Sequence, residues 1–113
     1  MNKVIPDGPF ETYYESGELK EKGTYKDGMK EGHWESYHEN GQLWQWCNYR
    51  SGVVDGPFEI YFDNGQLLMR GTKKDGVDDG PAVAYKINGQ LSVKGIYKDG
   101  EFEKDEFIED WQL

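Results

Sequence analysis

The sequence is poor in cysteine, in long apolar runs and in positive charge. Its one cysteine, Cys47, cannot form an intrachain disulfide, which suits a reducing compartment, so we expect a cytoplasmic protein. No apolar run approaches the roughly 20 residues of a transmembrane helix. Residues 1–7 also lack the apolar region of a signal peptide.

Negative charge dominates, with 22 Asp and Glu residues against 13 Lys and Arg residues and a net charge of −9. Such a chain repels the phosphates of nucleic acid and of anionic membranes, so we expect neither as a partner. It would instead attract a basic protein during encounter. The alternative is that the acidity serves solubility alone.

Residue groupings typical of enzymes and metal sites are also missing. His33 and His38 are five residues apart, so in a strand they point to opposite faces, and nothing else stands at zinc-binding spacing. Cys47 has no neighbouring base in the sequence and is expected to be a small buried residue. The Asp-Gly pairs lack the ligand series of a calcium loop. We therefore expect no catalytic residue, no metal and no cofactor.

What the sequence does have is a repeat of 24 residues. Gly8-Pro-Phe-Glu-Thr-Tyr returns as Gly32-His-Trp-Glu-Ser-Tyr, as Gly56-Pro-Phe-Glu-Ile-Tyr and as Gly80-Pro-Ala-Val-Ala-Tyr. A fixed period in this range is typical of repeat architectures, whose units bury their apolar faces against their neighbours. The predicted organisation is a lead-in, four repeats and an acidic C-terminal cap or tail: residues 1–7, 8–31, 32–55, 56–79, 80–103 and 104–113.

Glycine marks the turns of each repeat. Numbered from 1 to 24, the repeats place glycine in fifteen of the sixteen places at positions 1, 10, 16 and 21, and Cys47 in the other. Asn-Gly at positions 9 and 10, as in Asn40-Gly41, favours a two-residue type I′ hairpin turn. A second turn follows at Asp-Gly or Ser-Gly. No segment has helical periodicity, so the sequence predicts an all-β fold of eight short strands in an antiparallel meander.

The two-residue turn predicts which positions share a face of the sheet. Positions 3, 5, 7, 12, 14, 16 and 18 form face A, and positions 4, 6, 13 and 15 form face B. On face A, Phe10, Trp34 and Phe58 lie opposite the small residues at position 16. A ring over a cross-strand glycine covers exposed backbone, so we expect face A to be the core side.

Face B is predicted to be charged, with an aromatic interruption. Glu at position 4 opposes Lys or Arg at position 15, a pairing worth about 0.2–1 kcal/mol. In the second repeat, Trp46 opposes Glu35 and Trp44 opposes Tyr37 instead. Face B would then carry an aromatic patch within a charged surface. The alternative is that the faces are reversed and these rings form the core.

The run from Tyr25 to Leu43, Tyr-Lys-Asp-Gly-Met-Lys-Glu-Gly-His-Trp-Glu-Ser-Tyr-His-Glu-Asn-Gly-Gln-Leu, resembles the MORN-variant repeat. The resemblance extends over residues 8–103 and implies four hairpins stacked into one elongated, twisted antiparallel meander sheet. It also implies a scaffold or interaction module. Many small bacterial proteins of this type are assigned as antitoxins or immunity proteins. Ala82 and Val83 depart from the pattern, since an aromatic residue and Glu are expected there.

Two functions remain open. The first is a bacterial antitoxin or immunity protein, a monomer or small oligomer that neutralises a basic, enzymatic toxin by binding it through face B. The second is a structural scaffold or self-assembling repeat protein. Aromatic anchors within a polar surround are typical of interface hot spots. The candidate partner-binding residues are five aromatic and five acidic ones: Trp44, Trp46, Tyr37, Tyr61, Tyr13, Glu11, Glu35, Glu39, Glu59 and Asp63.

Residues 104–113 leave the repeat. Phe107 and Trp111 are four residues apart, which allows a short helix, while an extended strand covering the last sheet edge is the alternative.

Overall fold

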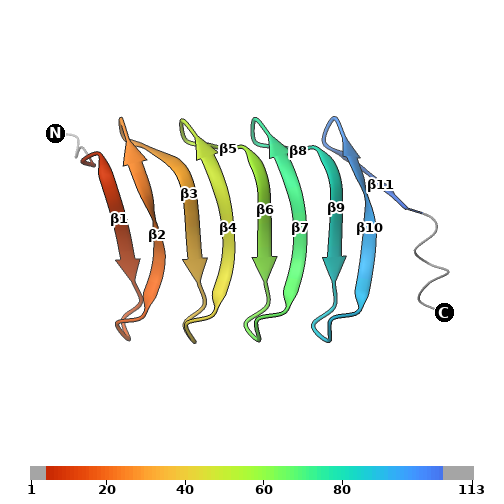
Figure 1. Ribbon diagram of the computed structural model, residues 1–113, viewed down its shortest axis with the longest axis horizontal. Helices are drawn as coiled ribbons and strands as arrows, with labels where there is room; N and C mark the ends of the chain where they lie inside the picture. The colour runs from red at the N-terminus through yellow and green to blue at the C-terminus, as the bar shows by residue number, and fades with distance from the viewer. Residues whose placement is uncertain (1–4, 106–113) are drawn as a thin grey trace.

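The computed structural model describes residues 5–105, and these form one open antiparallel sheet of hairpins without a helix (Figure 1). The sheet measures 57 × 34 × 19 Å, so it is a single layer. The predicted all-β fold of hairpin repeats is confirmed. The predictions for the tail beyond Asp105 lie outside the described residues.

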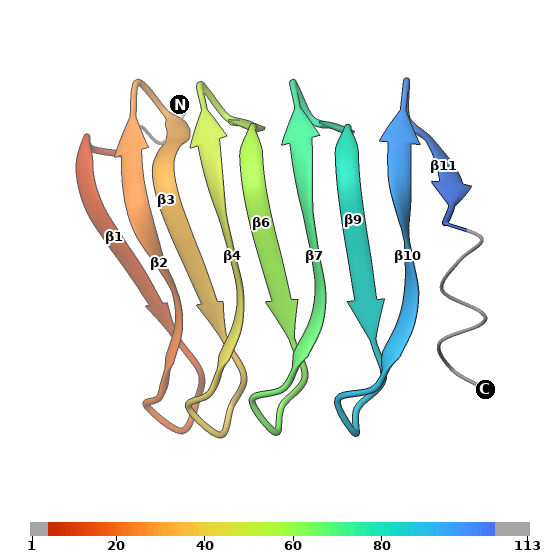
Figure 2. The ribbon, with the colours of Figure 1, turned by 45° about the vertical axis from the view of Figure 1, so that its right-hand side comes forward.

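The strands follow one another across the sheet in chain order, as Figure 2 shows. The long strands pair in the order β1-β2-β3-β4-β6-β7-β9-β10-β11, while the two-residue strands β5 and β8 pair with β4 and β7. The eight predicted strands correspond to the long strands up to β10, and β11 adds a further edge strand. Their bounds are β1 Gly8–Tyr13, β2 Leu19–Lys26, β3 Met29–Tyr37, β4 Leu43–Arg50, β5 Val53–Val54, β6 Gly56–Tyr61, β7 Leu67–Lys74, β8 Val77–Asp78, β9 Gly80–Tyr85, β10 Leu91–Lys98 and β11 Glu101–Lys104.

The predicted type I′ turn at Asn40-Gly41 is wrong. Only the glycine has a positive φ, 88°, and its N–H donates a hydrogen bond to the His38 carbonyl. The result is a three-residue loop with its glycine in the left-handed region. The physical reason is that the Asn40 side-chain oxygen accepts a hydrogen bond from the Gln42 N–H, which holds Asn40 in another conformation.

Type I′ geometry occurs at the other turn of the repeat. Asp27 and Gly28 both have positive φ, 52° and 79°, as this turn requires. Ser51-Gly52 repeats the pattern with 50° and 83°. Asp tolerates the left-handed region better than most residues, so the Asp-Gly pairs supply the tight turn.

The longer loop shifts the strand pairing near its end. Glu35 opposes Trp46, as predicted, but a bulge places Tyr37 opposite Leu43. The predicted pairing of Tyr37 with Trp44 is therefore wrong. The cause is the three-residue loop, which leaves Trp44 as the extra residue of β4 without a direct partner on β3.

The core lies on face A, as predicted. Trp34, Phe58 and Ala82, all at position 3, are the buried hydrophobic residues of the described chain, with 3%, 8% and 8% of their surfaces exposed. A Cβ added at Gly23 would overlap the Trp34 indole, and one added at Gly71 would lie 3.1 Å from the Phe58 ring. The rings therefore occupy the space that glycine leaves on the neighbouring strand.

Polar side chains tie each hairpin to the next. The Tyr14 hydroxyl donates a hydrogen bond to the Tyr37 carbonyl, and one repeat later the His38 Nε2–H donates one to the Tyr61 carbonyl at 3.0 Å. The Asn40 amide donates to the next loop, at the Asp63 carbonyl, over 2.7 Å. These bonds hold neighbouring loops side by side and so fix the surface that they form.

Candidate binding surface

A single row of side chains crosses face B. Acidic and basic side chains alternate along it, except that Trp46 stands where the other repeats have a cation and Val83 stands where they have Glu. The second repeat therefore lacks one positive charge on this row. Strand pairing gives the order Glu11, Lys22, Glu35, Trp46, Glu59, Arg70, Val83 and Lys94.

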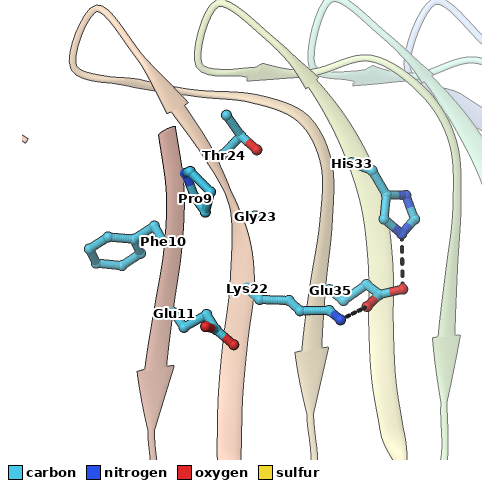
Figure 3. A pocket seen from close by; sticks show the side chains of 8 residues that line it. All are labelled: Pro9, Phe10, Glu11, Lys22, Gly23, Thr24, His33 and Glu35. Carbon is cyan, nitrogen blue, oxygen red and sulfur yellow. Dashed lines mark hydrogen bonds and ion pairs between the residues drawn. The ribbon is translucent and has the colours of Figure 1, made fainter. Parts of the chain in front are cut away.

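Glu35 is held by three neighbours on this face. The Tyr37 hydroxyl donates to Oε1 at 2.6 Å, His33 Nε2 lies 3.0 Å from Oε2, and Lys22 Nζ lies 3.6 Å from Oε1. Figure 3 shows Lys22 and His33 reaching the two oxygens of this carboxylate, Lys22 from the left and His33 from above. The Tyr37 bond lowers the pKa of Glu35, and burial, with the Glu35 bond, raises the pKa of Tyr37 to about 12.

Glu59 has a similar setting one repeat later. Its Oε1 accepts hydrogen bonds from Trp46 Nε1 at 2.7 Å and from the Tyr61 hydroxyl at 2.6 Å. Its Oε2 lies 4.0 Å from the Arg70 guanidinium, whose side chain is mostly exposed. Burial and the Glu59 bond raise the pKa of Tyr61. The protein thus orients Glu59 through Oε1 and leaves Oε2 with a loose ion pair.

The two histidines both lie against the tryptophans of β4. The His33 ring is 5.6 Å from the Trp46 ring, and the His38 ring is 5.6 Å from the Trp44 ring. β3 ends at Tyr37, so His38 belongs to the loop and the prediction of opposite faces, made for two residues in a strand, does not apply to it.

A shallow hollow of about 580 Å³ lies between the loops of the second and third hairpins. Trp44 forms part of it and is 42% exposed, a large fraction for a tryptophan. Two acidic residues, Glu39 and Asp63, lie on its rim and are exposed. We call this feature the Trp44 hollow. Its lining residues are Tyr14, His38, Glu39, Asn40, Trp44 and Asp63.

The structure sorts the ten candidate residues into three groups. The first is a hydrogen-bonded centre on β3, β4 and β6, which contains Glu35, Tyr37, Trp46, Glu59 and Tyr61. The second lines the hollow and contains Trp44, Glu39 and Asp63. The third lies on the edge strand β1, where Glu11 and Tyr13 are exposed. The first two groups share the second repeat, so they form the main candidate surface.

Sequence reasoning missed several residues of this surface. The alternation of His33, Glu35 and Tyr37 along one strand face was a usable signal for the His33 contact. No signal in the sequence pointed to Tyr14 and His38, because they precede loops whose geometry the sequence did not reveal.

Residues 5–105 contain no group of three or more His, Cys, Asp or Glu residues that could hold a metal ion. The same part of the chain has no helix with the length and apolar character needed to cross a membrane.

Comparison with known proteins adds one finding. The sequence pattern of the MORN repeat variant family matches residues 6–27, 30–51 and 54–72. These segments fall on the first three hairpins and together make up more than half of the chain. No curated protein matches the sequence.

Proposed function

Because the chain belongs to the MORN repeat variant family, we propose that it is a protein-binding module that neutralises a basic, enzymatic toxin through face B, as an antitoxin or immunity protein does. MORN repeats are generally associated with binding and protein interaction. In this proposal the chain itself performs no catalysis and acts in the cytoplasm. The finer assignment rests on the chemistry of the second repeat.

The observation that carries the proposal is the replacement of cations by indoles on one strand. Positions 13 and 15 hold Lys20 and Lys22 in the first repeat but Trp44 and Trp46 in the second. Exposed aromatic side chains with polar neighbours favour protein contacts, because they bury much surface at little cost in side-chain entropy. A partner would cover the indoles and supply the missing positive charge.

The carboxylates beside these indoles are already oriented for such a partner. The lowered pKa of Glu35 keeps it ionised at neutral pH, and Glu59 is fixed by two donors on Oε1. Preorganised groups lose little entropy on binding, which favours affinity. A basic partner would also be steered toward a chain of net charge −9, at a rate that falls with added salt.

A pull-down from a lysate of the source organism, followed by an activity assay of the captured protein, tests the proposal. The baits are the wild type, the double variant Trp44→Ala/Trp46→Ala, and a matched control, Leu68→Ala/Arg70→Ala, which changes the same two positions in the third repeat. We expect the wild type and the control to capture a basic enzyme and to inhibit it. The tryptophan variant should do neither.

Two results would contradict the proposal. One is equal capture by all three baits, which would place binding elsewhere on the sheet. The other is a captured enzyme that keeps its full activity in the complex, because neutralisation would then be absent.

A second function, that of a scaffold, is favoured by one feature of face A. Positions 5 and 14 form a row across the sheet that is polar in the first two repeats and apolar in the last two. The apolar half of this row is half-buried and has no second layer over it, which suits association between copies. The row reads Thr12, Glu21, Ser36, Gln45, Ile60, Met69, Ala84 and Val93.

Light scattering distinguishes the scaffold function from the inhibitor function. A scaffold predicts assemblies that grow with protein concentration and that Ala84→Glu disrupts, with Thr12→Glu as the matched control in the polar half of the row. A monodisperse monomer or small oligomer, unchanged by either substitution, would leave the inhibitor as the better account.

A further inference from the structure

We infer that the Trp44 hollow binds the guanidinium group of an arginine side chain presented by the protein partner. This inference rests on the proposed function and names the chemistry that one part of the candidate binding surface recognises. It concerns the hollow alone and is independent of the hydrogen-bonded centre around Trp46.

The walls of the hollow are positioned by bonds between neighbouring loops. The loops that join β3 to β4 and β6 to β7 lie side by side at the same end of the sheet (Figures 1 and 2). Asn40 Nδ2 donates to the Asp63 carbonyl at 2.7 Å, and His38 Nε2 donates to the Tyr61 carbonyl at 3.0 Å. The hollow therefore exists before any ligand arrives, which lowers the entropy cost of binding.

The charge of the hollow is negative and unbalanced. Glu39 and Asp63 are exposed, and within residues 5–105 neither forms an ion pair. By contrast, the acidic residues of the neighbouring row, Glu35 and Glu59, each have a cation within 4.0 Å. A cation entering the hollow would meet two carboxylates that the chain itself leaves available.

Trp44 provides the surface on which a cation would stack. The side chain is 42% exposed and its ring lies 5.6 Å from that of His38, which supports it from one side. The face of an indole attracts cations through its negative quadrupole, and tryptophan is the best of the aromatic residues in this role.

The first repeat contains an internal parallel. There, position 13 is Lys20, and its ammonium lies over the Tyr14 ring, 5.6 Å from the ring centroid. Tyr14 is also part of the lining of the Trp44 hollow. This end of the sheet thus already pairs a cation with a ring in the first repeat. In the second repeat the chain supplies the ring and the carboxylates but no cation.

Arginine fits this hollow better than lysine does. Its guanidinium is planar, so it stacks flat on an indole while its edge donates hydrogen bonds to carboxylates on either side. An ammonium group is a point charge that is more strongly hydrated, and it loses more of that hydration on entering the hollow. We therefore expect a preference for arginine.

Short peptides test the inference directly, since the partner is not needed. Isothermal titration of the wild type with tetra-arginine, tetra-lysine and tetra-glutamate peptides at low salt should give binding in that order, with no binding of tetra-glutamate. Trp44→Ala and Glu39→Gln/Asp63→Asn should each weaken tetra-arginine binding at least fivefold. The control Asp27→Asn/Asp99→Asn removes two exposed carboxylates at the opposite end of the sheet and should weaken it less than twofold.

Three outcomes would overturn the inference: no binding of tetra-arginine by the wild type, equal weakening by the hollow and control variants, or no preference of arginine over lysine. The first two would mean that the hollow is not a site, or that net charge alone attracts the peptide. The third would mean that a planar guanidinium gains nothing over an ammonium group in the hollow.

A further pull-down distinguishes a failure of the arginine-binding inference from a failure of the proposed function. The pull-down is repeated with Glu39→Gln/Asp63→Asn as bait. If the basic enzyme is still captured and inhibited while tetra-arginine does not bind the wild type, the hollow is wrong and the binding function stands. If the wild type captures no enzyme, the proposed function fails whatever the peptides show.

Discussion

Trp34 and Trp44 belong to neighbouring strands of one hairpin, yet one is buried in the core and the other is exposed to solvent. Trp34 is 3% exposed and lies over Gly23, with its Nε1–H bonded to the Thr24 carbonyl at 3.1 Å. Trp44 is 42% exposed and contacts a histidine at the rim of a hollow. The same residue type therefore serves the core on face A and remains available for binding on face B.

The comparison of the two faces shows that one face of a single-layer sheet can supply the packing while the other carries the residues that vary. Face A buries rings where a neighbouring strand has glycine, so the burial of Trp34 depends on Gly23 of β2. Neither face is covered by a second layer, but the described residues of face B are not packed over glycine in this way, so they are freer to differ between repeats. The indoles of the second repeat replace the lysines of the first without disturbing the strand pairing.

The largest effect is expected from removing the core tryptophan. Trp34→Ala should lower the free energy of unfolding by about 3–5 kcal/mol, the range for large aromatic residues in a core. Its ring packs against Tyr25 with centroids 5.2 Å apart and under Lys30, so several contacts disappear together. Urea unfolding followed by circular dichroism measures the change. A loss below about 1 kcal/mol would mean that face A is not the core.

A smaller loss is expected from filling the space under that ring. Gly23→Ala places a methyl group where the Trp34 indole lies, and overpacking of this kind costs about 1–3 kcal/mol. Gly71→Ala is the matched control, because its Cβ would stand 3.1 Å from Phe58 and needs only a small adjustment. The same urea titration should rank Gly23→Ala as the more destabilising. The reverse order would contradict the packing described here.

The hydrogen bond between Tyr37 and Glu35 on face B should make the stability of the protein depend on pH. The pKa of Tyr37 is raised from 10.0 to about 12 by burial and by its bond to Glu35, so the folded state favours the neutral hydroxyl. The stability from this group is therefore complete below pH 10 and is lost as the pH rises from about 10 to about 12.

Absorbance titration of tyrosinate measures this directly. The wild type should show a tyrosine that ionises near pH 12, and Tyr37→Phe should remove it. Tyr13→Phe is the control, since Tyr13 is 57% exposed. If Tyr37→Phe leaves the late-ionising fraction unchanged, the bond to Glu35 is absent in solution.

The smallest effect on stability is expected at the binding surface. Trp44→Ala should change the free energy of unfolding by no more than about 0.5 kcal/mol, as is usual for an exposed side chain. This value sharpens the contrast with Trp34→Ala in the same hairpin. A loss of more than about 2 kcal/mol would mean that Trp44 supports the fold, and the proposed surface would lose its anchor.

Much of the fold followed from the sequence. The repeat period, the strand alternation and the glycine at position 16 were enough to identify face A as the core and to pair Glu35 with Trp46. The loop geometry was not predictable, because the Asn40 side chain bonds to the backbone and competes with the type I′ turn. The error then affected the predicted pairing of Trp44 with Tyr37, which depends on that loop. For this reason the hollow emerged only from the three-dimensional structure.

The division between the two faces is tested most directly by fluorine NMR of the protein labelled with 5-fluorotryptophan, with and without the captured partner. Four tryptophan signals are expected, and Trp→Phe variants assign them. The account predicts that the partner shifts or broadens the signals of Trp44 and Trp46 and leaves that of Trp34 unchanged. A complex that shifts Trp34 while leaving Trp44 and Trp46 as they were would place binding on face A and contradict the account.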